Sequence, residues 1–129
     1  LISRGGYVLL DHPNPKLLFI ATGSEVNIAI QAARELKVAG ISARVVSMPC
    51  AELFCLQDKE YRDRVLPPNL LNRIAIEALH KDYWYKFVGL SGIVIGMETF
   101  GESAPGDVLM QEFGFTKKNL VNVAKGMLS

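Results

Sequence analysis

The stretch that decides the fold is Leu17-Leu18-Phe19-Ile20-Ala21-Thr22-Gly23-Ser24-Glu25. It opens with a continuous apolar run of strand length, and such a run suits a strand buried on both faces of a sheet. Ser24 is a good N-cap, because its hydroxyl can accept a hydrogen bond from a free amide in the first turn of a helix. The stretch therefore predicts a buried strand that passes directly into a helix.

The helix predicted after Ser24 extends to about Ala39, and Gly40 is its expected left-handed stop. Apolar residues recur at helical spacing along it and should form its buried face: Val26, Ala29, Ile30, Ala33 and Leu36. Further strands are predicted at residues 44–47, 73–77 and 93–97. Helices are predicted at 58–65, 82–88, 105–113 and 116–125.

Apolar strands that alternate with amphipathic helices require a mostly parallel sheet with helices on both faces. A further short strand is predicted at residues 7–10, and only a tight Pro-rich turn joins it to the next strand. That connection is too short for a parallel crossover, so this strand should be antiparallel and at an edge. The predicted fold is a three-layer α/β/α sandwich around a five-stranded, mostly parallel sheet.

Length and composition favour one soluble domain. The chain has 129 residues, and its 14 Lys and Arg against 13 Asp and Glu give a net charge of +1. The positive charges are scattered, which argues against nucleic-acid or membrane-surface binding. Residues 1–6 are interpreted as a linker remnant and 7–129 as one α/β domain. Because the sequence starts without Met, we expect it to be a piece of a longer protein.

The two cysteines, Cys50 and Cys55, lack the Cys-x-x-Cys spacing of redox motifs, and there is no second pair that could build a zinc site. Nothing cationic stands beside Cys50 in the sequence to lower the pKa of its thiol. Both are therefore predicted to be buried, reduced thiols in a cytoplasmic protein.

The carboxyl ends of the parallel strands should gather polar residues at one edge of the sheet, where α/β proteins usually bind ligands. The predicted polar crevice contains Ser24, Glu25, Glu77, His80, Glu98, Glu102 and Ser103. These groups could serve acid/base chemistry, but we favour helix capping and contact with a neighbouring domain. The Gly23-Ser24 turn could likewise be an anion nest, yet the complete phosphate-binding motifs are absent. No catalytic, cofactor-binding or metal-ligating residue is assigned.

The aromatic run Tyr83-Trp84-Tyr85, followed by Phe87, has two possible roles. Its rings could pack in the core or form an interface. Four aromatic residues in five positions cannot all face one core, so we expect at least one to face a partner.

Five blocks of the sequence resemble, in order, the C-terminal domain of transketolases of the bacterial type. They occupy residues 21–26, 44–49, 82–86, 99–105 and 112–116, and the pair Phe-Gly-Glu-Ser-Ala-Pro and Phe-Gly-Phe-Thr is the most specific. Cys50, Cys55 and Leu79-His80 depart from the family pattern. The resemblance covers nearly the whole chain and implies the same five-stranded sheet, with one antiparallel strand.

The resemblance also implies a function. Transketolases transfer a two-carbon ketol unit from a ketose phosphate to an aldose phosphate in the pentose phosphate pathway, with thiamine diphosphate and a divalent metal, Mg²⁺ or Ca²⁺. They are cytoplasmic homodimers whose cofactor sites lie between the first two domains of opposite subunits. The third domain has no established catalytic residue. The chain is thus expected to be a structural and dimerisation domain, inactive by itself and without a cofactor of its own.

Two alternatives remain open. One is a separate regulatory or anion-binding module, which an anion bound at Ser24 would favour. The other is the equivalent domain of a related thiamine enzyme, such as deoxyxylulose phosphate synthase or the pyruvate dehydrogenase beta subunit. The Phe-Gly-Glu-Ser-Ala-Pro stretch favours transketolase over these relatives.

Overall fold

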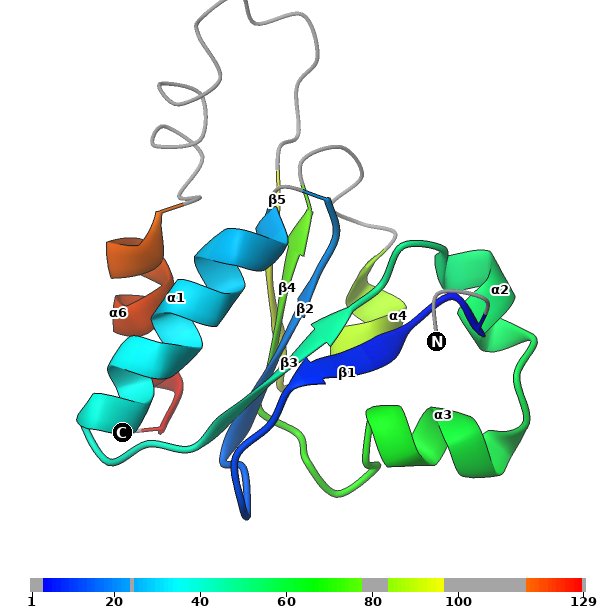
Figure 1. Cartoon of the computed structure of the whole chain (residues 1–129), viewed down its shortest axis with the longest axis horizontal. Coiled ribbons are helices and arrows are strands. Elements are labelled where there is room, and N and C mark those ends of the chain that lie inside the picture. The colour runs from blue at the N-terminus through cyan, green and yellow to red at the C-terminus, as the bar shows by residue number, and fades with distance from the viewer. Residues whose placement is uncertain (1–3, 24, 78–83, 97–115, 129) are drawn as a thin grey trace, which may run out of the picture.

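A computed structural model describes residues 4–23, 25–77, 84–96 and 116–128. Within these ranges one five-stranded sheet has the order β1-β3-β2-β4-β5 (Figure 1). Its strands are β1 Tyr7–Leu10, β2 Leu17–Ala21, β3 Ala43–Ser47, β4 Arg73–Glu77 and β5 Ile93–Gly96. Helices cover both faces, so the three-layer architecture predicted from the sequence is confirmed.

The strand directions also agree with the prediction. β2 pairs in parallel with both β3 and β4, and β4 pairs in parallel with β5. β1 pairs with β3 in the antiparallel direction and forms one edge of the sheet, with an irregular register between Val8 and Leu10. The short Pro-rich turn after β1 leaves no room for a crossover helix, which is why this strand alone runs the other way.

One face of the sheet is covered by two long helices, α1 (Glu25–Val38) and α6 (Lys117–Leu128), which lie together on the left in Figure 1. Because side chains alternate along a strand, Leu17, Phe19 and Ala21 of β2 point to this face and are fully buried. The apolar layer that results joins the alanine-rich side of α1 to Leu120 and Ala124 of α6.

Three short helices cover the opposite face: α2 (Ala51–Cys55), α3 (Lys59–Val65) and α4 (Tyr85–Val88). Leu18 and Ile20 of β2 belong to the core on this side, together with Phe54 of α2. Aromatic rings contribute much of this packing, since the Phe54 ring lies 6.1 Å from the Tyr61 ring and 6.4 Å from the Phe87 ring.

Most helix ends were predicted correctly. The Asp58 carboxylate caps α3 by accepting from the Tyr61 amide at 2.8 Å, and the Thr116 hydroxyl caps α6 by accepting from the Asn119 amide at 3.1 Å. Gly40 and Gly89 have φ of 86° and 74°, the left-handed conformation expected at helix stops.

Three details differ from the prediction. On α1 the buried face contains Glu25 and Ala32, whereas Val26 and Ile30 are only half-buried. α6 ends at Leu128 instead of 125. α2 was not predicted at all. The capping residues Ser24 and Asp82 and the predicted helix at 105–113 lie outside the described residues.

The segment before β1 packs closely on α2 and α3. The Cys50 amide donates to the Gly5 carbonyl at 2.9 Å, and the Tyr61 hydroxyl donates to the Gly6 carbonyl at 2.7 Å. The guanidinium carbon of Arg4 lies 4.5 Å from the centroid of the Tyr61 ring. Where a linker ends and the domain begins stays a prediction, but residues 4–6 belong to the packed structure.

Candidate functional site

The sheet topology creates a switch point between β2 and β4. From β2 the chain crosses to β3 on one side, and β4 returns to lie on the other side of β2. Crossovers in opposite directions leave a crevice at the carboxyl ends of the two central strands, the usual ligand site of open α/β sheets. Ala21 pairs with Ile76, so the ends of β2 and β4 lie side by side at the edge where the polar crevice was predicted.

At this switch point, the first amides of α1 donate hydrogen bonds to backbone carbonyls of the preceding turn. The amides of Glu25 and Val26 donate to the carbonyls of Thr22 and Gly23, at 3.1 and 3.3 Å. Gly23 has a φ of 56°, which favours glycine and makes the tight turn possible. Two amides that an anion nest would need are therefore already bonded.

Glu25 is buried, with 6% of its surface exposed, in the first turn of α1. A carboxylate there interacts favourably with the positive end of the helix dipole. It would also repel a phosphate at the same place. The described part of the crevice thus favours a structural role for Glu25 over anion binding.

The predicted crevice is only partly within the described residues. Glu25 begins α1 and Glu77 ends β4, opposite Gly96 of β5. Ser24, His80, Glu98, Glu102 and Ser103 lie outside the described residues. The grouping of these side chains into one polar site stays a prediction. Ser47 also reaches this edge, as the last residue of β3, and is buried beside Ala21.

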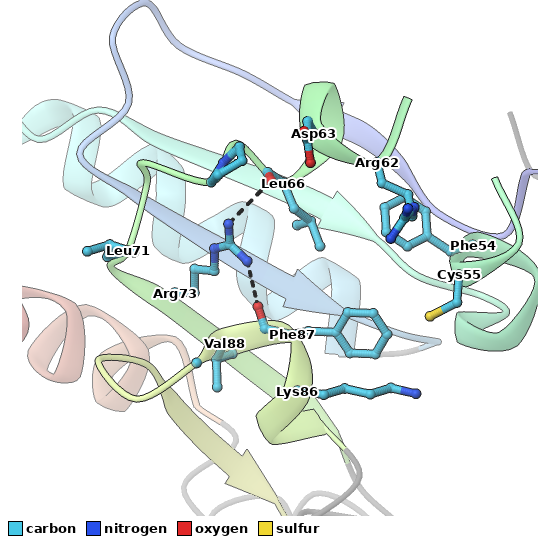
Figure 2. Close-up of a pocket in the computed structure, with 12 residues that line it drawn as sticks. Phe54, Cys55, Arg62, Asp63, Leu66, Leu71, Arg73, Lys86, Phe87 and Val88 are labelled. Atoms are coloured by element: carbon cyan, nitrogen blue, oxygen red, sulfur yellow. Dashed lines mark hydrogen bonds between the residues drawn. The ribbon is translucent and has the colours of Figure 1, made fainter. Parts of the chain in front are cut away.

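A second hollow was not predicted. A cavity of about 420 Å³ opens among α2, α3, the loop after α3 and α4 (Figure 2). Its residues are Phe54, Cys55, Arg62, Asp63, Leu66, Pro68, Leu71, Arg73, Lys86, Phe87, Val88 and Gly89. They come from several elements and share no sequence motif, so no spacing signal could have revealed it. We call this hollow the α3–α4 cavity.

Arg73, the first residue of β4, joins the two sides of the α3–α4 cavity. Its guanidinium donates to the carbonyls of Leu70 at 2.8 Å, Pro67 at 2.7 Å and Phe87 at 2.7 Å, with a longer contact of 3.3 Å to Leu66. Figure 2 shows this side chain between the loop and α4. Burial lowers the pKa of Arg73, and the nearby Asp63 carboxylate opposes that shift.

The prediction of buried cysteines is wrong. Cys55 is exposed and Cys50 is half-buried, and both are free thiols. The reason is α2, in which Ala51 and Phe54 turn to the core and the neighbouring Cys55 consequently turns outward. The Cys50 thiol lies 3.8 Å from the Glu52 carboxylate and donates to it, whereas Cys55 lines the α3–α4 cavity.

Two rings of the aromatic run belong to the core. Trp84 and Phe87 are buried in the core, with ring centroids 5.4 Å apart. Tyr83 lies outside the described residues. That one of the four rings faces a partner stays a prediction.

Binding of thiamine diphosphate with a divalent metal requires several oxygen ligands close together. Within residues 4–23, 25–77, 84–96 and 116–128, no three His, Cys, Asp or Glu side chains are grouped to hold a metal ion. No residue of these ranges is assigned to the cofactor or its metal. In the same ranges, no helix combines the length and apolar character that crossing a membrane requires.

Comparison with known proteins gives the family. The sequence model of the "Transketolase-like TK C-terminal domain" matches residues 5–116. Transketolase 1 of Escherichia coli K12 is 55% identical over 128 residues, 98% of this chain and 19% of that protein. The chain thus spans about a fifth of the length of the curated relatives it matches.

Solved structures of transketolases share the fold of this chain. Transketolase from Campylobacter jejuni has a TM-score of 0.85 and 38% identity, covering 97% of this chain and 19% of that one. Transketolase from Leishmania mexicana has a TM-score of 0.88 and 37% identity, covering 98% of this chain and 18% of that one. The same five-stranded sheet and the match across most of the sequence lead to one conclusion: the chain belongs to the transketolase C-terminal domain family.

Proposed function

We propose that this chain is the C-terminal structural and dimerisation domain of a transketolase. The whole protein would transfer a two-carbon ketol unit from a ketose phosphate to an aldose phosphate. The observation that carries the proposal is the family match over residues 5–116, with relatives named transketolase that are about five times as long.

The polar side chains of this chain support a structural role. Arg73 fastens a loop to α4 through carbonyl oxygens. Arg44 pairs with Asp11 at 3.1 Å and also donates to the Arg64 carbonyl at the end of α3. These charged groups are engaged in holding elements together. Thiamine diphosphate and its divalent metal, Mg²⁺ or Ca²⁺, would be bound by other parts of the whole protein.

The partners would be the remaining domains and a second subunit of a cytoplasmic homodimer. Exposed apolar side chains offer surface for such contacts: Leu56, Leu71 and Leu90 all extend into solvent. A single exposed leucine is ordinary in a monomer, but neighbouring domains commonly bury such positions. The docked segment at residues 4–6 would fix where a preceding domain is attached.

A chimera tests this proposal. In Escherichia coli transketolase 1, the segment matching this chain is replaced by the chain itself, and a truncated enzyme lacking the segment serves as control. We expect the chimera to sediment as a dimer and to retain ketol transfer, and the truncated enzyme to lose the dimer. A well-folded chimera that is monomeric and inactive would contradict the proposal.

The isolated chain provides a second test. It should show no ketol transfer and no saturable heat on titration with thiamine diphosphate and Mg²⁺, because the described residues do not group metal ligands. Tight, saturable cofactor binding by the isolated chain would place the cofactor site in this domain and overturn the proposal.

A further inference from the structure

We propose that the α3–α4 cavity, with the exposed leucines beside it, is the surface on which the preceding domain of the whole protein docks, and that an apolar side chain of that domain enters the cavity. The inference rests on the proposed function in one respect, because it takes the chain to be one domain of a longer transketolase. The surface is separate from the switch point, since Arg73 in its lining stands at the amino end of β4.

The cavity is lined largely by apolar side chains. Phe54, Leu66, Phe87 and Val88 line it and are themselves buried. Its volume of about 420 Å³ lies in the range of pockets that receive small molecules, about 300–1,000 Å³, so a large apolar side chain has room in it. In protein interfaces, anchor side chains that fill such pockets contribute much of the binding free energy.

Exposed leucines gather beside this cavity. Leu71 lines it and is 59% exposed, whereas Leu56 and Leu90 each directly follow a lining residue and are 80% and fully exposed. On α1 and α6, which cover the other face of the sheet, Val38 is the one large apolar residue that is exposed. A single exposed leucine is ordinary, but a group of them around an apolar hollow is typical of a contact surface.

The charged side chains of the cavity interact within the chain, so they do not select a charged ligand. Arg73 donates to backbone carbonyls, and the Asp63 carboxylate acts on it electrostatically. Asp63 also forms a salt bridge within α3. The Lys86 Nζ lies 5.2 Å from the centroid of the Phe87 ring, and the Arg62 Nε donates to a backbone carbonyl at 3.1 Å. What the cavity offers an occupant is therefore mainly apolar contact.

The chain enters the domain next to this surface. The segment at Gly6 packs closely on α2, because a Cβ added to this glycine would lie 2.9 Å from the Phe54 ring. The Tyr61 hydroxyl of α3 donates to the Gly6 carbonyl at 2.7 Å. Since Phe54 also lines the cavity, the same ring contacts both the entering segment and the hollow. A domain attached ahead of Arg4 is thus joined beside the cavity.

This placement favours the preceding domain over a second copy of the chain. The curated relatives are about five times as long, and the matching family model is that of their C-terminal domain. A domain joined by a short connection has an effective concentration in the millimolar range. A free second copy does not reach that level at ordinary protein concentrations.

Cys55 reports on the docking, because it lines the cavity and its thiol is free and exposed. The rate at which iodoacetamide labels it is measured by mass spectrometry in the isolated chain and in the chimera with Escherichia coli transketolase 1. We expect labelling to be about tenfold slower in the chimera, since docking favoured by about 1.4 kcal/mol leaves roughly one molecule in ten open.

A pair of variants separates docking from local effects on the thiol. Leu71 lies on the opposite side of the cavity from Cys55 (Figure 2). Leu71→Asp would bury a charge against the docked domain, and should speed labelling in the chimera about fivefold to tenfold without changing it in the isolated chain. Val38→Asp places the same charge at an exposed apolar position on the other face and should have no effect in either protein. Preserved NMR dispersion establishes that the isolated variants fold.

Photo-crosslinking identifies the occupant. Leu90→p-benzoylphenylalanine in the chimera should give, on irradiation, a product with the mass of one subunit, whose crosslinked peptide comes from the part ahead of this chain. A product with the mass of two subunits would assign the surface to the partner subunit and overturn the inference.

Two further results would overturn it: equally fast labelling of Cys55 in the isolated chain and in the folded chimera, and a Leu71→Asp chimera that labels no faster than the unchanged one. Labelling of the isolated chain that slows as its concentration rises would assign the cavity to a second copy instead. In a dimeric, active chimera, rapid labelling of Cys55 rejects the docking surface and leaves the proposed function standing. A folded chimera that is monomeric and inactive contradicts the proposed function, and its Cys55 rate still decides whether the preceding domain docks.

Discussion

Replacing Arg73 with Met should loosen the contact between the loop at residues 66–72 and α4. The substitution keeps the volume of the long side chain but removes the donors that reach the carbonyls of Pro67, Leu70 and Phe87. Arg73 is the first residue of β4, so the sheet itself holds its backbone in place. The expected loss is therefore confined to the side chain's hydrogen bonds.

The magnitude follows from the geometry. A hydrogen bond to a charged group contributes about 1.5–3 kcal/mol, and Arg73 makes three at 2.7–2.8 Å and one at 3.3 Å. The gross sum is reduced, because the guanidinium loses hydration on burial and the freed carbonyls can bind water. We expect the free energy of unfolding to fall by about 2–4 kcal/mol, a large part of the ~5–15 kcal/mol typical of domains.

Urea denaturation measures this loss through the midpoint at constant m value. Arg62→Gln is the matched control, because Arg62 is exposed and makes one hydrogen bond, and it should cost less than about 1 kcal/mol. Arg73→Lys keeps the charge without the planar fork and should fall between the two. If Arg73→Met unfolds at the same urea concentration as the unchanged chain, the guanidinium does not hold the loop and the reasoning fails.

The burial of Arg73 also predicts how the difference in unfolding free energy between the unchanged chain and Arg73→Met depends on pH. Burial lowers the pKa of Arg73, so stability would rise with pH only as the pH approaches that lowered value. Arginine stays protonated far above neutrality. The difference in stability between the unchanged chain and Arg73→Met should therefore be constant from about pH 6 to about pH 9, and a clear slope would mean that another group titrates with it.

Three further changes test the packing of the chain. Tyr61→Phe removes the 2.7 Å hydrogen bond to the Gly6 carbonyl and should lower the unfolding free energy by about 1–2 kcal/mol in urea, so an unchanged midpoint would contradict it. Gly5→Ala puts a methyl group against the Cys50 carbonyl at a residue with a φ of 82°. The clash should release residues 4–6 from α2 and speed hydrogen exchange at the Cys50 amide, whereas unchanged exchange would refute it. Thr116→Ala removes the cap of α6 and should cost about 1 kcal/mol in thermal unfolding; an unaltered transition would show that the cap is dispensable.

The strands could be predicted from the sequence because each depends on a strong local signal. β2 is a continuous apolar run, and a strand buried on both faces needs no alternation. β1 was assigned as an antiparallel edge because the length of its connection excludes a parallel crossover, a constraint that tertiary packing cannot change. Caps such as Asp58 were found because side chain and amide are three residues apart.

The features that were missed have only weak local signals. α2 has five residues, too few for a helical period to appear, and its two core contacts are Ala51 and Phe54. Because α2 was not predicted, Cys55 was wrongly predicted to be buried. Arg73 looks like any charged residue that starts a strand, since its partners lie three to 14 residues away in a loop and in another helix. Of the predicted crevice, Glu25 and Glu77 are the members within the described residues.

Helix length explains why the cavity lies on one face of the sheet. At 1.5 Å per residue, the 14 residues of α1 reach about 21 Å and match the roughly 17 Å of a five-residue strand. The 5, 7 and 4 residues of α2, α3 and α4 reach only about 6–11 Å each, so no single one of them can cover a strand from end to end.

The spaces between short helices must be closed by loops and long side chains. Here the Arg73 side chain closes part of the space between α3 and α4. A guanidinium can bridge separate carbonyls where an apolar side chain could not satisfy them. It also brings a charge that carbonyl oxygens do not neutralise. The α3–α4 cavity is thus a consequence of covering one face with short helices, and its lining includes Arg73, the residue that holds the loop and α4 together.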